Sequence, residues 1–320
     1  MQVFDNDSNL APNLQPFALA LGMFDGFHIG HQALMRAVEQ VSAQLQLQSA
    51  VYTFSNHPNS VLRNQPVQLL LTKREKLRLL QSFGIQTVFM PVFDAALAGT
   101  QANVFLQRYL ALGMRAAVAG FNYRFGAKAQ GDVDLLQAVM QAQGLQAVVV
   151  QPVQIEGVAV STTRIKQMLL QGDVQTAQKA LGWYYSVAGT VVQGKQLGRT
   201  IGFPTINIAY DAEKLLPKMG VYAGVAQVDG AFYPAMVNIG TNPTVQSKDA
   251  VFVEAHILNF SRELYGANVR LHFVQRLRDE ERFASLQALM AQLQRDKAQT
   301  AHYFMLRDVS NMPLCPYLCE

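Results

Sequence analysis

Hydrophobic and polar positions follow two different patterns along this chain, and the change falls near residue 182. In the first part, short apolar runs alternate with segments whose apolar residues recur every three or four positions. The runs predict buried strands and the periodic segments predict helices. The predicted strands are 17–23, 50–54, 87–92, 115–119 and 147–150, and the predicted helices are 31–45, 73–83, 105–112 and 132–143. This alternation predicts an α/β domain with a doubly wound parallel sheet and helices on both faces.

The second part lacks helices between its apolar runs. β-branched and aromatic stretches are separated there by Gly, Pro, Asn and Asp, which predicts a small antiparallel β-barrel. The stretches are 184–192, 221–228, 232–237, 251–258 and 269–274, and a helix is predicted at 283–304. Two short helices, 164–170 and 174–181, precede the junction at Gly182. We therefore predict domains at 1–182 and 183–310, followed by a tail at 311–320.

Composition and charge narrow the class of protein. Half of the 320 residues are hydrophobic and 15% are charged, which is typical of a soluble globular protein. The chain has no apolar run of about 18 residues and no apolar signal core at its N-terminus, so we expect neither a membrane span nor a signal peptide. Cys315 and Cys319 fit neither zinc nor disulfide spacing well, and we interpret them as part of a reduced, dangling tail in a cytoplasmic protein.

The net charge of +4 is spread over both parts. Up to Gly182 there are 13 basic and 10 acidic residues, a net of +3, and beyond it 13 and 12, a net of +1. Neither part has the basic excess, interleaved with aromatic residues, that is typical of nucleic-acid binding. A nucleic-acid partner is therefore not expected.

The segment LGMFDGFHIGH at 21–31 is the first candidate site. It leads from a predicted strand into a helix, where glycines such as Gly22 and Gly30 let backbone N–H groups approach a phosphate. His28 and His31 lie on one face of the first helical turn and could donate hydrogen bonds to a departing pyrophosphate. The alternative is a pair of structural histidines at a helix cap.

Three further loops extend this candidate site. Ser161 suits the cap of a helix whose first turn carries Arg164, and a cation at that end is unfavourable unless an anionic ligand binds there. The alternative is that Arg164 points into solvent. His57 with Pro58, and Asn122 within GFNYRFG, follow other predicted strands, at the sheet edge where such folds bind ligands. Taken alone, these two loops could be ordinary turns.

Glycines mark a second candidate site in the barrel. Although residues 189–196 approach a Walker A motif, the last position lacks the required hydroxyl and no helix is expected to follow. Beyond this stretch, Gly194, Gly198 and Gly202, with Arg199 among them, permit close backbone approach to phosphates.

A short strand and one acidic residue complete this second site. Thr205 and Asn207, after Pro204, alternate on a strand and would present two neutral oxygens to Mg²⁺, with ATP supplying the other ligands. Glu254 is the acidic residue within an apolar strand pattern of this half, and it could act as a general base toward a substrate hydroxyl. The alternative is an exposed glutamate on an edge strand.

Taken in order, these motifs resemble the bacterial bifunctional riboflavin kinase/FAD synthetase family. The first part resembles its adenylyltransferase module through GMFDGFHIGH, TFSNHP, GFNYRFG and STTRIK. The second part resembles its riboflavin kinase domain through GKQLGRTIGFPTINI, GVYA, NIGTNPT, VEAHILNF, LYG and LRDEERF. The resemblance spans roughly residues 15–306.

The resemblance implies two ATP-dependent reactions and a role for each motif. The barrel would phosphorylate riboflavin to FMN, and the α/β domain would adenylylate FMN to FAD with release of pyrophosphate. The residues implied at the nucleotide of the α/β domain are Phe24, His28, His31, Asn122, Ser161 and Arg164, with His57 and Pro58 in the loop toward the flavin. The residues implied in the barrel are Thr205 and Asn207 for ATP–Mg²⁺, Glu254 as base for the ribityl 5′-hydroxyl, and Arg278, Glu280 and Phe283 at the flavin.

Two other functions remain to be weighed. An aminoacyl-tRNA synthetase shares the letters HIGH at 28–31 but needs a lysine-rich KMSKS-type loop, to which residues 218–220 are the nearest string. A flavin-responsive regulatory protein with a decayed site would lack some of the residues proposed for catalysis, and all are present. We therefore expect an enzyme that acts on riboflavin, FMN and ATP, without nucleic-acid or membrane partners, as a monomer or weak homo-oligomer.

Overall fold

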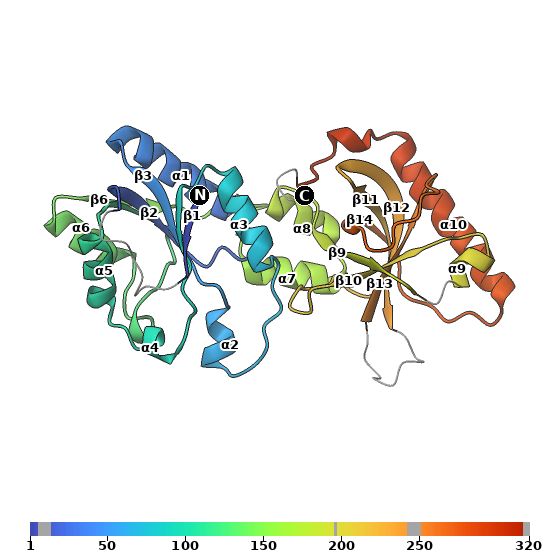
Figure 1. Cartoon of the computed structure of the whole chain (residues 1–320), viewed down its shortest axis with the longest axis horizontal. Helices are drawn as coiled ribbons and strands as arrows, with labels where there is room; N and C mark the ends of the chain where they lie inside the picture. The colour runs from blue at the N-terminus through green and yellow to red at the C-terminus, as the bar shows by residue number, and fades with distance from the viewer. Residues whose placement is uncertain (6–13, 195–196, 242–250, 316–320) are drawn as a thin grey trace. The chain divides into compact units, whose positions relative to one another are not determined.

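The computed structural model of the chain describes residues 1–5, 14–194, 197–241 and 251–315. The chain divides into two compact units, Met1–Thr162 and Thr163–Glu320 (Figure 1). No helix in the described part of the chain is long and apolar enough to cross a membrane.

A parallel sheet forms the centre of the first unit, with the strand order β1-β4-β3-β2-β5-β6. The strands are β1 (Gln2–Phe4), β2 (Phe17–Leu21), β3 (Gln48–Tyr52), β4 (Thr87–Phe89), β5 (Met114–Gly120) and β6 (Gln146–Val150). Each neighbouring pair is parallel, as predicted. Strand β1 was not predicted, because three residues are too few to show a period.

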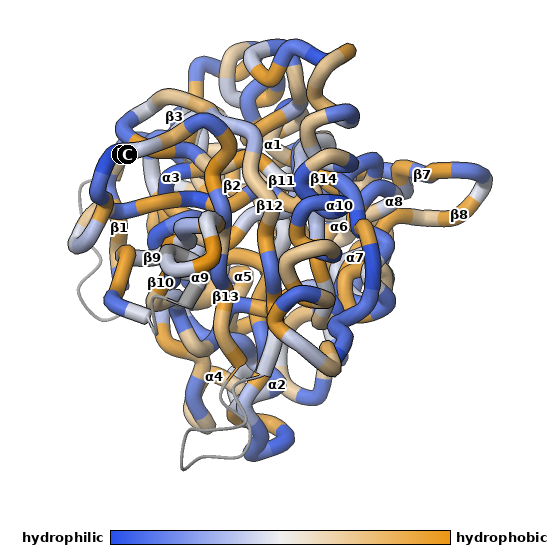
Figure 2. Tube along the Cα trace, turned by 90° about the vertical axis from the view of Figure 1, so that its right-hand side faces the viewer, coloured by the Kyte–Doolittle hydropathy of each residue, from blue (hydrophilic) through white to orange (hydrophobic). Residues whose placement is uncertain are grey.

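Helices cover both faces of this sheet, as predicted. They are α1 (Ile29–Leu45), α2 (Pro58–Leu62), α3 (Lys73–Ser82), α4 (Ala95–Ala98), α5 (Ala102–Ala111), the 3₁₀ turn η2 (Ala127–Ala129) and α6 (Val133–Ala142). Side chains of β2 alternate between the faces, so Leu19 packs in one cluster with Tyr109 of α5 and Leu136 of α6. Helix α1 packs on β2 from the other side. A hairpin of β7 (Gln154–Ile155) and β8 (Val158–Ala159) extends outward in Figure 2.

The strand order reverses between β2 and β5. From β2 the chain continues to β3 and β4 on one side, and later to β5 and β6 on the other. Leu21 at the end of β2 is in register with Tyr52 of β3 and Ala119 of β5. The loops that follow these three strands therefore begin side by side at the same edge of the sheet. Ligands of open α/β sheets bind at such a reversal, beyond the carboxyl ends of the strands.

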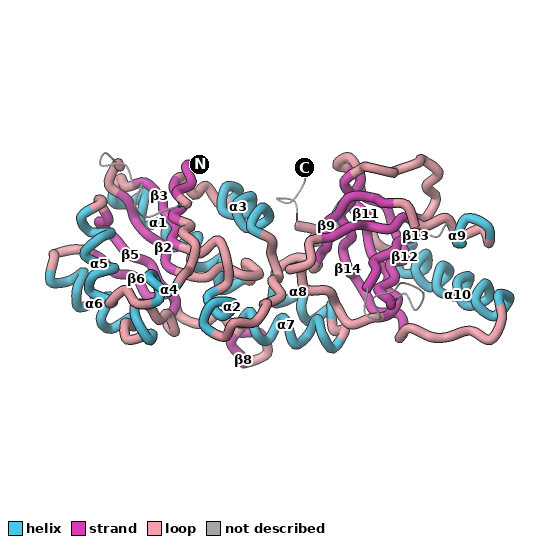
Figure 3. Tube along the Cα trace, turned by 60° about the horizontal axis from the view of Figure 1, so that its bottom comes forward, coloured by secondary structure: helices cyan, strands magenta, loops and turns pink. Residues whose placement is uncertain are grey.

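A closed barrel forms the centre of the second unit, with the strand order β10-β13-β12-β11-β14-β9. The strands are β9 (Ser186–Val192), β10 (Ile206–Tyr210), β11 (Gly220–Val228), β12 (Ala231–Thr241), β13 (Val251–Ile257) and β14 (Asn268–Arg278), and their pairings are antiparallel, as predicted. The helical segments are α7 (Thr162–Gln171), α8 (Val174–Leu181), α9 (Leu197–Thr200), α10 (Leu286–Met305) and the 3₁₀ turn η3 (Val309–Asn311). Helix α10 lies against β11 and β12 on the outside of the barrel (Figure 3).

The junction and the C-terminal segment differ from the sequence expectation. Helix α8 packs against β14, so the compact units divide after Thr162, two short helices before Gly182. The functional boundary at Gly182 stays a prediction. A dangling tail is wrong for the residues up to 315, because Leu314 joins a core cluster with Phe304 and Cys315 is fully buried. Cys319 lies outside the described residues.

Candidate active sites

The loop after β2 is buried and conformationally strained. Phe24 and Phe27 are inaccessible to solvent and have positive φ angles of 50° and 49°. Such angles cost a bulky residue about 1–3 kcal/mol and are concentrated at functional sites. Gly22 is required below the loop, because a Cβ there would stand 2.8 Å from the Phe24 ring. The fold therefore holds this loop in one unusual shape.

The two histidines lie together where this loop enters α1. His28 is the N-cap, and its Nδ1 accepts a hydrogen bond of 3.3 Å from the backbone N–H of His31. Gly30 lies between them, and the two rings stack with their centroids 3.7 Å apart. His28 therefore caps α1 through its Nδ1, as the alternative interpretation expected, and its Nε2 remains for a ligand.

Burial keeps both histidines neutral near pH 7. It lowers the pKa of His28 to about 4. It also holds the pKa of His31 well below its usual value, and the nearby positive charge of Lys76 acts in the same direction. Because Nδ1 of His28 accepts a hydrogen bond, its proton is on Nε2, which can donate to a phosphate oxygen.

Hydrogen bonds from distant segments fix Asp25 in the same loop. Its carboxylate accepts the backbone N–H groups of Leu70 at 2.8 Å and Leu71 at 3.3 Å. Its carbonyl accepts the hydroxyl of Thr162 at 2.7 Å. Ser161 therefore directly precedes a residue that contacts the histidine loop. Arg164 follows in the first turn of α7, within the second compact unit, and its role at the nucleotide stays a prediction.

The loops after β3 and β5 flank the histidine loop at the same edge of the sheet. His57 is the N-cap of α2, where its Nδ1 accepts the N–H of Asn59 at 3.1 Å, and Pro58 is the first helical residue. Asn56 accepts the N–H of Phe93 at 2.7 Å and donates to its carbonyl at 3.0 Å, so it ties this loop to the one after β4. Asn122 is exposed just after β5.

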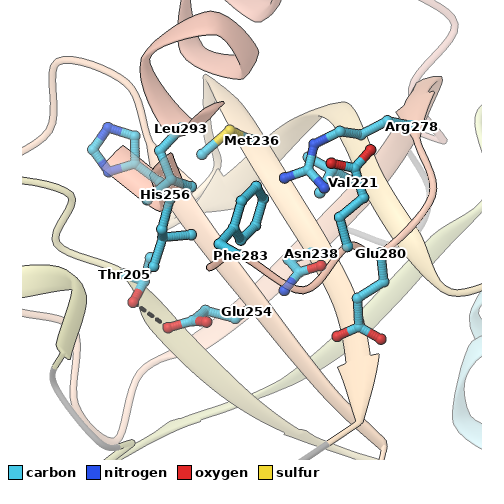
Figure 4. A pocket seen from close by; sticks show the side chains of 12 residues that line it. Thr205, Val221, Met236, Asn238, Glu254, His256, Arg278, Glu280, Phe283 and Leu293 are labelled. Carbon is cyan, nitrogen blue, oxygen red and sulfur yellow. Dashed lines mark hydrogen bonds between the residues drawn. The ribbon is translucent and has the colours of Figure 1, made fainter. Parts of the chain in front are cut away.

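The second unit contains a cavity of about 190 Å³ between the barrel and α10 (Figure 4). Its lining residues are Thr205, Val221, Met236, Asn238, Glu254, His256, Arg278, Glu280, Glu281, Phe283, Leu289 and Leu293. In Figure 4 the pair Thr205–Glu254 lies at one end and Arg278 with Glu280 at the other, with Phe283 between them. An apolar wall with polar groups at both ends suits a planar ligand with polar edges. Five of the predicted barrel residues therefore meet in one cavity.

Strand register brings the polar groups around Glu254 together. Glu254 of β13 pairs with Asn207 of β10 on one side and with Asn238 of β12 on the other. The hydroxyl of Thr205 donates a hydrogen bond to Glu254 Oε1. A hydroxyl that donates its proton keeps its lone pairs, so Thr205 can still bind a cation. Because β13 lies between two barrel strands, the edge-strand alternative for Glu254 is wrong.

The predicted glycine loop approaches this group from β9. A Cβ at Gly194 would overlap the carboxamide of Asn207, so this approach requires glycine. Gly198 lies in the one-turn helix α9, and Gly202 follows it with a φ of 80°. A short helix therefore does follow the near-Walker stretch, against expectation, although the stretch still lacks the motif's hydroxyl. The side chain of Arg199 and residues 195–196 lie outside the described part.

Among the cavity residues that sequence reasoning missed are two polar side chains on the barrel strands, Asn238 and His256. Asn238 has a buried carboxamide oxygen with no hydrogen-bond partner in the described chain. His256 is bound through Nδ1 to the carbonyl of Pro204 at 2.8 Å, its Nε2 is buried without a partner among the described residues, and burial lowers its pKa. Period-two alternation from Glu254 would have placed His256 on the same face of β13.

A partly buried ion pair orients Arg278. Its guanidinium donates three hydrogen bonds of 2.8–3.1 Å to the carboxylate of Asp296 on α10, and it lies 5.7 Å from the ring centroid of Phe283. Glu280 lies against Gly240, where a Cβ would overlap its carboxylate. These contacts fix the polar end of the cavity opposite Glu254.

Comparison with known families matches the two parts of the chain separately. The FAD synthetase model matches residues 10–164 and the riboflavin kinase model matches residues 181–304. Three curated relatives are each named bifunctional riboflavin kinase/FMN adenylyltransferase. That of Listeria monocytogenes is 35% identical over 89% of this chain and 92% of its own length. Those of Bacillus subtilis and Escherichia coli K12 are 31% and 34% identical, over 89% and 90% of this chain and 92% and 93% of their own lengths.

One solved structure covers nearly the whole chain. It is described as a macrolide-efflux protein from Streptococcus pneumoniae and is 30% identical. It covers 93% of this chain and 97% of its own, with a TM-score of 0.85. The arrangement of a parallel sheet followed by a barrel therefore occurs in a protein solved independently.

Proposed function

The chain belongs to the family of bifunctional riboflavin kinase/FMN adenylyltransferases, and we propose from this premise that each of its two domains contains one complete active site. The protein phosphorylates riboflavin to FMN and adenylylates FMN to FAD. We assign the kinase to residues 183–310 and the adenylyltransferase to residues 1–182, with ATP as the donor in both. The hydrogen bond between Thr205 and Glu254 inside the cavity is the observation that carries the kinase assignment.

In the kinase reaction we assign the proton transfer to Glu254. Its carboxylate accepts the proton of the ribityl 5′-hydroxyl, the oxygen attacks the γ-phosphorus of ATP, and ADP leaves. The flavin ring lies against Phe283 and the aliphatic residues of the cavity, and Arg278 and Glu280 bind its polar edge. The cavity supports this assignment because it holds these groups at opposite ends.

A magnesium ion fits beside the same glutamate. Thr205 and Asn207 offer neutral oxygens next to a carboxylate, which is the type of donor that Mg²⁺ prefers. Within the described ranges no three His, Cys, Asp or Glu side chains converge as a metal cage, so phosphate oxygens of ATP would complete the coordination. When bound, Mg²⁺ neutralises phosphate charge during the transfer. Gly194, Gly198, Arg199, Gly202 and Pro204 shape the phosphate loop around it.

The adenylylation reaction needs positioning and charge neutralisation more than a base. The FMN phosphate is already anionic when it attacks the α-phosphorus of ATP, and pyrophosphate leaves. The Nε2–H of His28, His31 beside it and the N-terminus of α1 stabilise the leaving pyrophosphate. Asn122, Ser161 and Arg164 complete the nucleotide site together with Gly22, Phe24 and Gly30. We place the flavin toward His57 and Pro58.

Magnesium removal and product analysis test this proposal together. Purified protein is incubated with riboflavin and ATP, with Mg²⁺ or with excess EDTA, and the flavins are separated by chromatography. We expect FMN and then FAD with Mg²⁺, and neither product with EDTA until Mg²⁺ is restored. Undiminished FMN formation in EDTA would contradict the metal assignment, and absence of both products with Mg²⁺ would contradict the assignment of the sites.

We also propose that the protein works on small molecules in the cytoplasm as a monomer or weak homo-oligomer, without nucleic acid. The near-even spread of charge over both parts supports the absence of a nucleic-acid partner.

A further inference from the structure

Helix α3 places an ammonium group under the histidine loop, and no step described above uses it. Lys76 is only 6% exposed. Its Nζ donates hydrogen bonds to the carbonyl of Met23 at 3.1 Å and to the carbonyl of Phe54 at 3.2 Å. Met23 belongs to the loop after β2 and Phe54 to the loop after β3. One buried cation therefore joins the two loops that we assign to phosphate and flavin.

Burial makes the charge of Lys76 costly, and the nearby carboxylate of Asp25 compensates that charge only in part. Both of its hydrogen bonds go to backbone carbonyls, which a neutral donor could also satisfy, and a buried charge is costly without strong pairing. Asp25 faces it from the loop, His28 and His31 from the start of α1, and Glu75 precedes it on α3. Asp25 is bound to the N–H groups of Leu70 and Leu71, and Glu75 closes the capping box of α3 with Thr72.

We propose that Lys76 is a positioning residue for adenylylation, which fixes the histidine loop against the flavin loop and, in its ammonium form, supplies a positive charge behind the phosphate site. The inference rests on the proposed assignment of adenylylation to this domain. The polyphosphate of ATP and the released pyrophosphate are strongly anionic, so a fixed cation behind their site lowers the energy of charge that develops there. The charge of Lys76 adds to burial in lowering the pKa of His31.

This role predicts a dependence on pH. Burial lowers the pKa of Lys76 from 10.5 to about 8, and the nearby Asp25 acts in the opposite direction. The ammonium form is therefore present below about pH 8 and is lost as the pH rises through that value. Adenylylation should decline by about tenfold per pH unit above this point, whereas riboflavin phosphorylation in the same samples should not.

Substitutions of Lys76, with a matched control on the same helix, test the proposal. FMN adenylylation and riboflavin phosphorylation are measured for the wild type, Lys76→Met, Lys76→Arg and Lys73→Met between pH 6.5 and 9.5. Lys73 is exposed and paired with Asp5 at 3.1 Å, so its substitution controls for loss of a lysine from α3. We expect Lys76→Met to lose adenylylation at least tenfold at pH 7 with phosphorylation within twofold of the wild type, and Lys73→Met to keep both. Lys76→Arg should keep a measurable activity without the alkaline decline, because arginine stays charged.

Three results would overturn the proposal. These are adenylylation by Lys76→Met within twofold of Lys73→Met, an unchanged alkaline decline in Lys76→Arg, or a wild-type profile that stays flat to pH 9.5. If a Lys76 variant does not fold, the wild-type profile decides, with phosphorylation as the internal control. A wild type that forms no FAD at any pH would instead contradict the proposed function.

Discussion

Glu254 receives its partners from the two strands beside it, β10 and β12, and from Thr205 directly before β10. Thr205 donates to its carboxylate, Asn207 pairs with it across β10, and Asn238 pairs with it across β12. Barrel closure therefore concentrates one carboxylate, one hydroxyl and two carboxamides at a single point. Such a group can take up a proton and bind a cation without any covalent intermediate.

We expect a substitution of Asn238 to lower the kinase activity strongly while it changes the stability of the protein little. Leaving a buried polar atom unsatisfied costs about 1–3 kcal/mol, so the similarly sized Asn238→Leu should change the free energy of unfolding by less than about 1 kcal/mol. The same substitution should lower the rate of FMN formation at least tenfold, because a polar contact beside Glu254 is lost. Urea unfolding and initial rates measure the two effects.

Asn268→Leu, at the exposed start of β14, is the matched control for this substitution. It should leave FMN formation unchanged. A fully active Asn238→Leu protein, or one whose activity falls only in proportion to its folded fraction, would contradict the assignment of Asn238 to the kinase site.

Sequence reasoning can find Glu254 but not Asn238, for a physical reason. An acidic residue inside an apolar strand is conspicuous, because burial of an unpaired charge is costly. An asparagine in a strand has the same pattern whether it faces solvent or a cavity, and its orphaned oxygen appears only when three strands close around it. His28 and His31 were found from their spacing, whereas Lys76 was not, because its partners Met23 and Phe54 are distant in sequence.

Pairing between elements fixes the far end of the kinase cavity. Arg278 ends β14, and Asp296 lies in the middle of α10, where its side chain is 2% exposed. The bidentate contact between them orients the guanidinium over Phe283. Helix α10 therefore forms part of the site as well as a cover for the barrel.

Asp296→Ala should disturb both the packing and the chemistry of the second unit. Removing one partner of a fully buried ion pair costs about 3–5 kcal/mol, which is an upper limit here because Arg278 is partly exposed and still donates to the carbonyl of Asp279. We expect a loss of stability up to this size in urea unfolding and a higher KM for riboflavin, with adenylylation of supplied FMN unchanged at temperatures where the protein is folded.

Arg295→Ala is the neighbouring control. Arg295 is exposed and bonds to Gln292 of the same helix, so its loss should cost less than about 1 kcal/mol. Equal effects of the two substitutions would contradict the role given to the Arg278–Asp296 pair.

Periodic helices and strands with a continuous apolar run were predictable, including strands of three to five residues such as β2 and β4, whereas short elements without such a pattern were not. The alternation of apolar runs and helices predicted the parallel sheet and the barrel, because burial of one face imposes a period over many residues. The elements that were missed include strands β1 and β7 and helices α2, α4 and α9, which span five residues or fewer. Tertiary contacts decide their formation, and the sequence carries no comparable signal for them.

At the scale of the whole molecule, FMN is the product of one activity and the substrate of the other. The two family models match separate parts of the chain and leave residues 165–180 outside both. Helices α7 and α8 occupy this interval, and α8 packs with the barrel. Each set of assigned residues lies mainly within one compact unit, with Arg164 of α7 at the junction, so each activity should depend on its own set alone.

The most direct test of two separate active sites is one product assay on two variants. His28→Ala with His31→Ala and, separately, Glu254→Ala are incubated with ATP and Mg²⁺ and either riboflavin or FMN. We predict that the histidine variant forms FMN from riboflavin but no FAD, and that Glu254→Ala forms no FMN yet converts supplied FMN to FAD. Loss of both reactions in either folded variant would contradict this prediction.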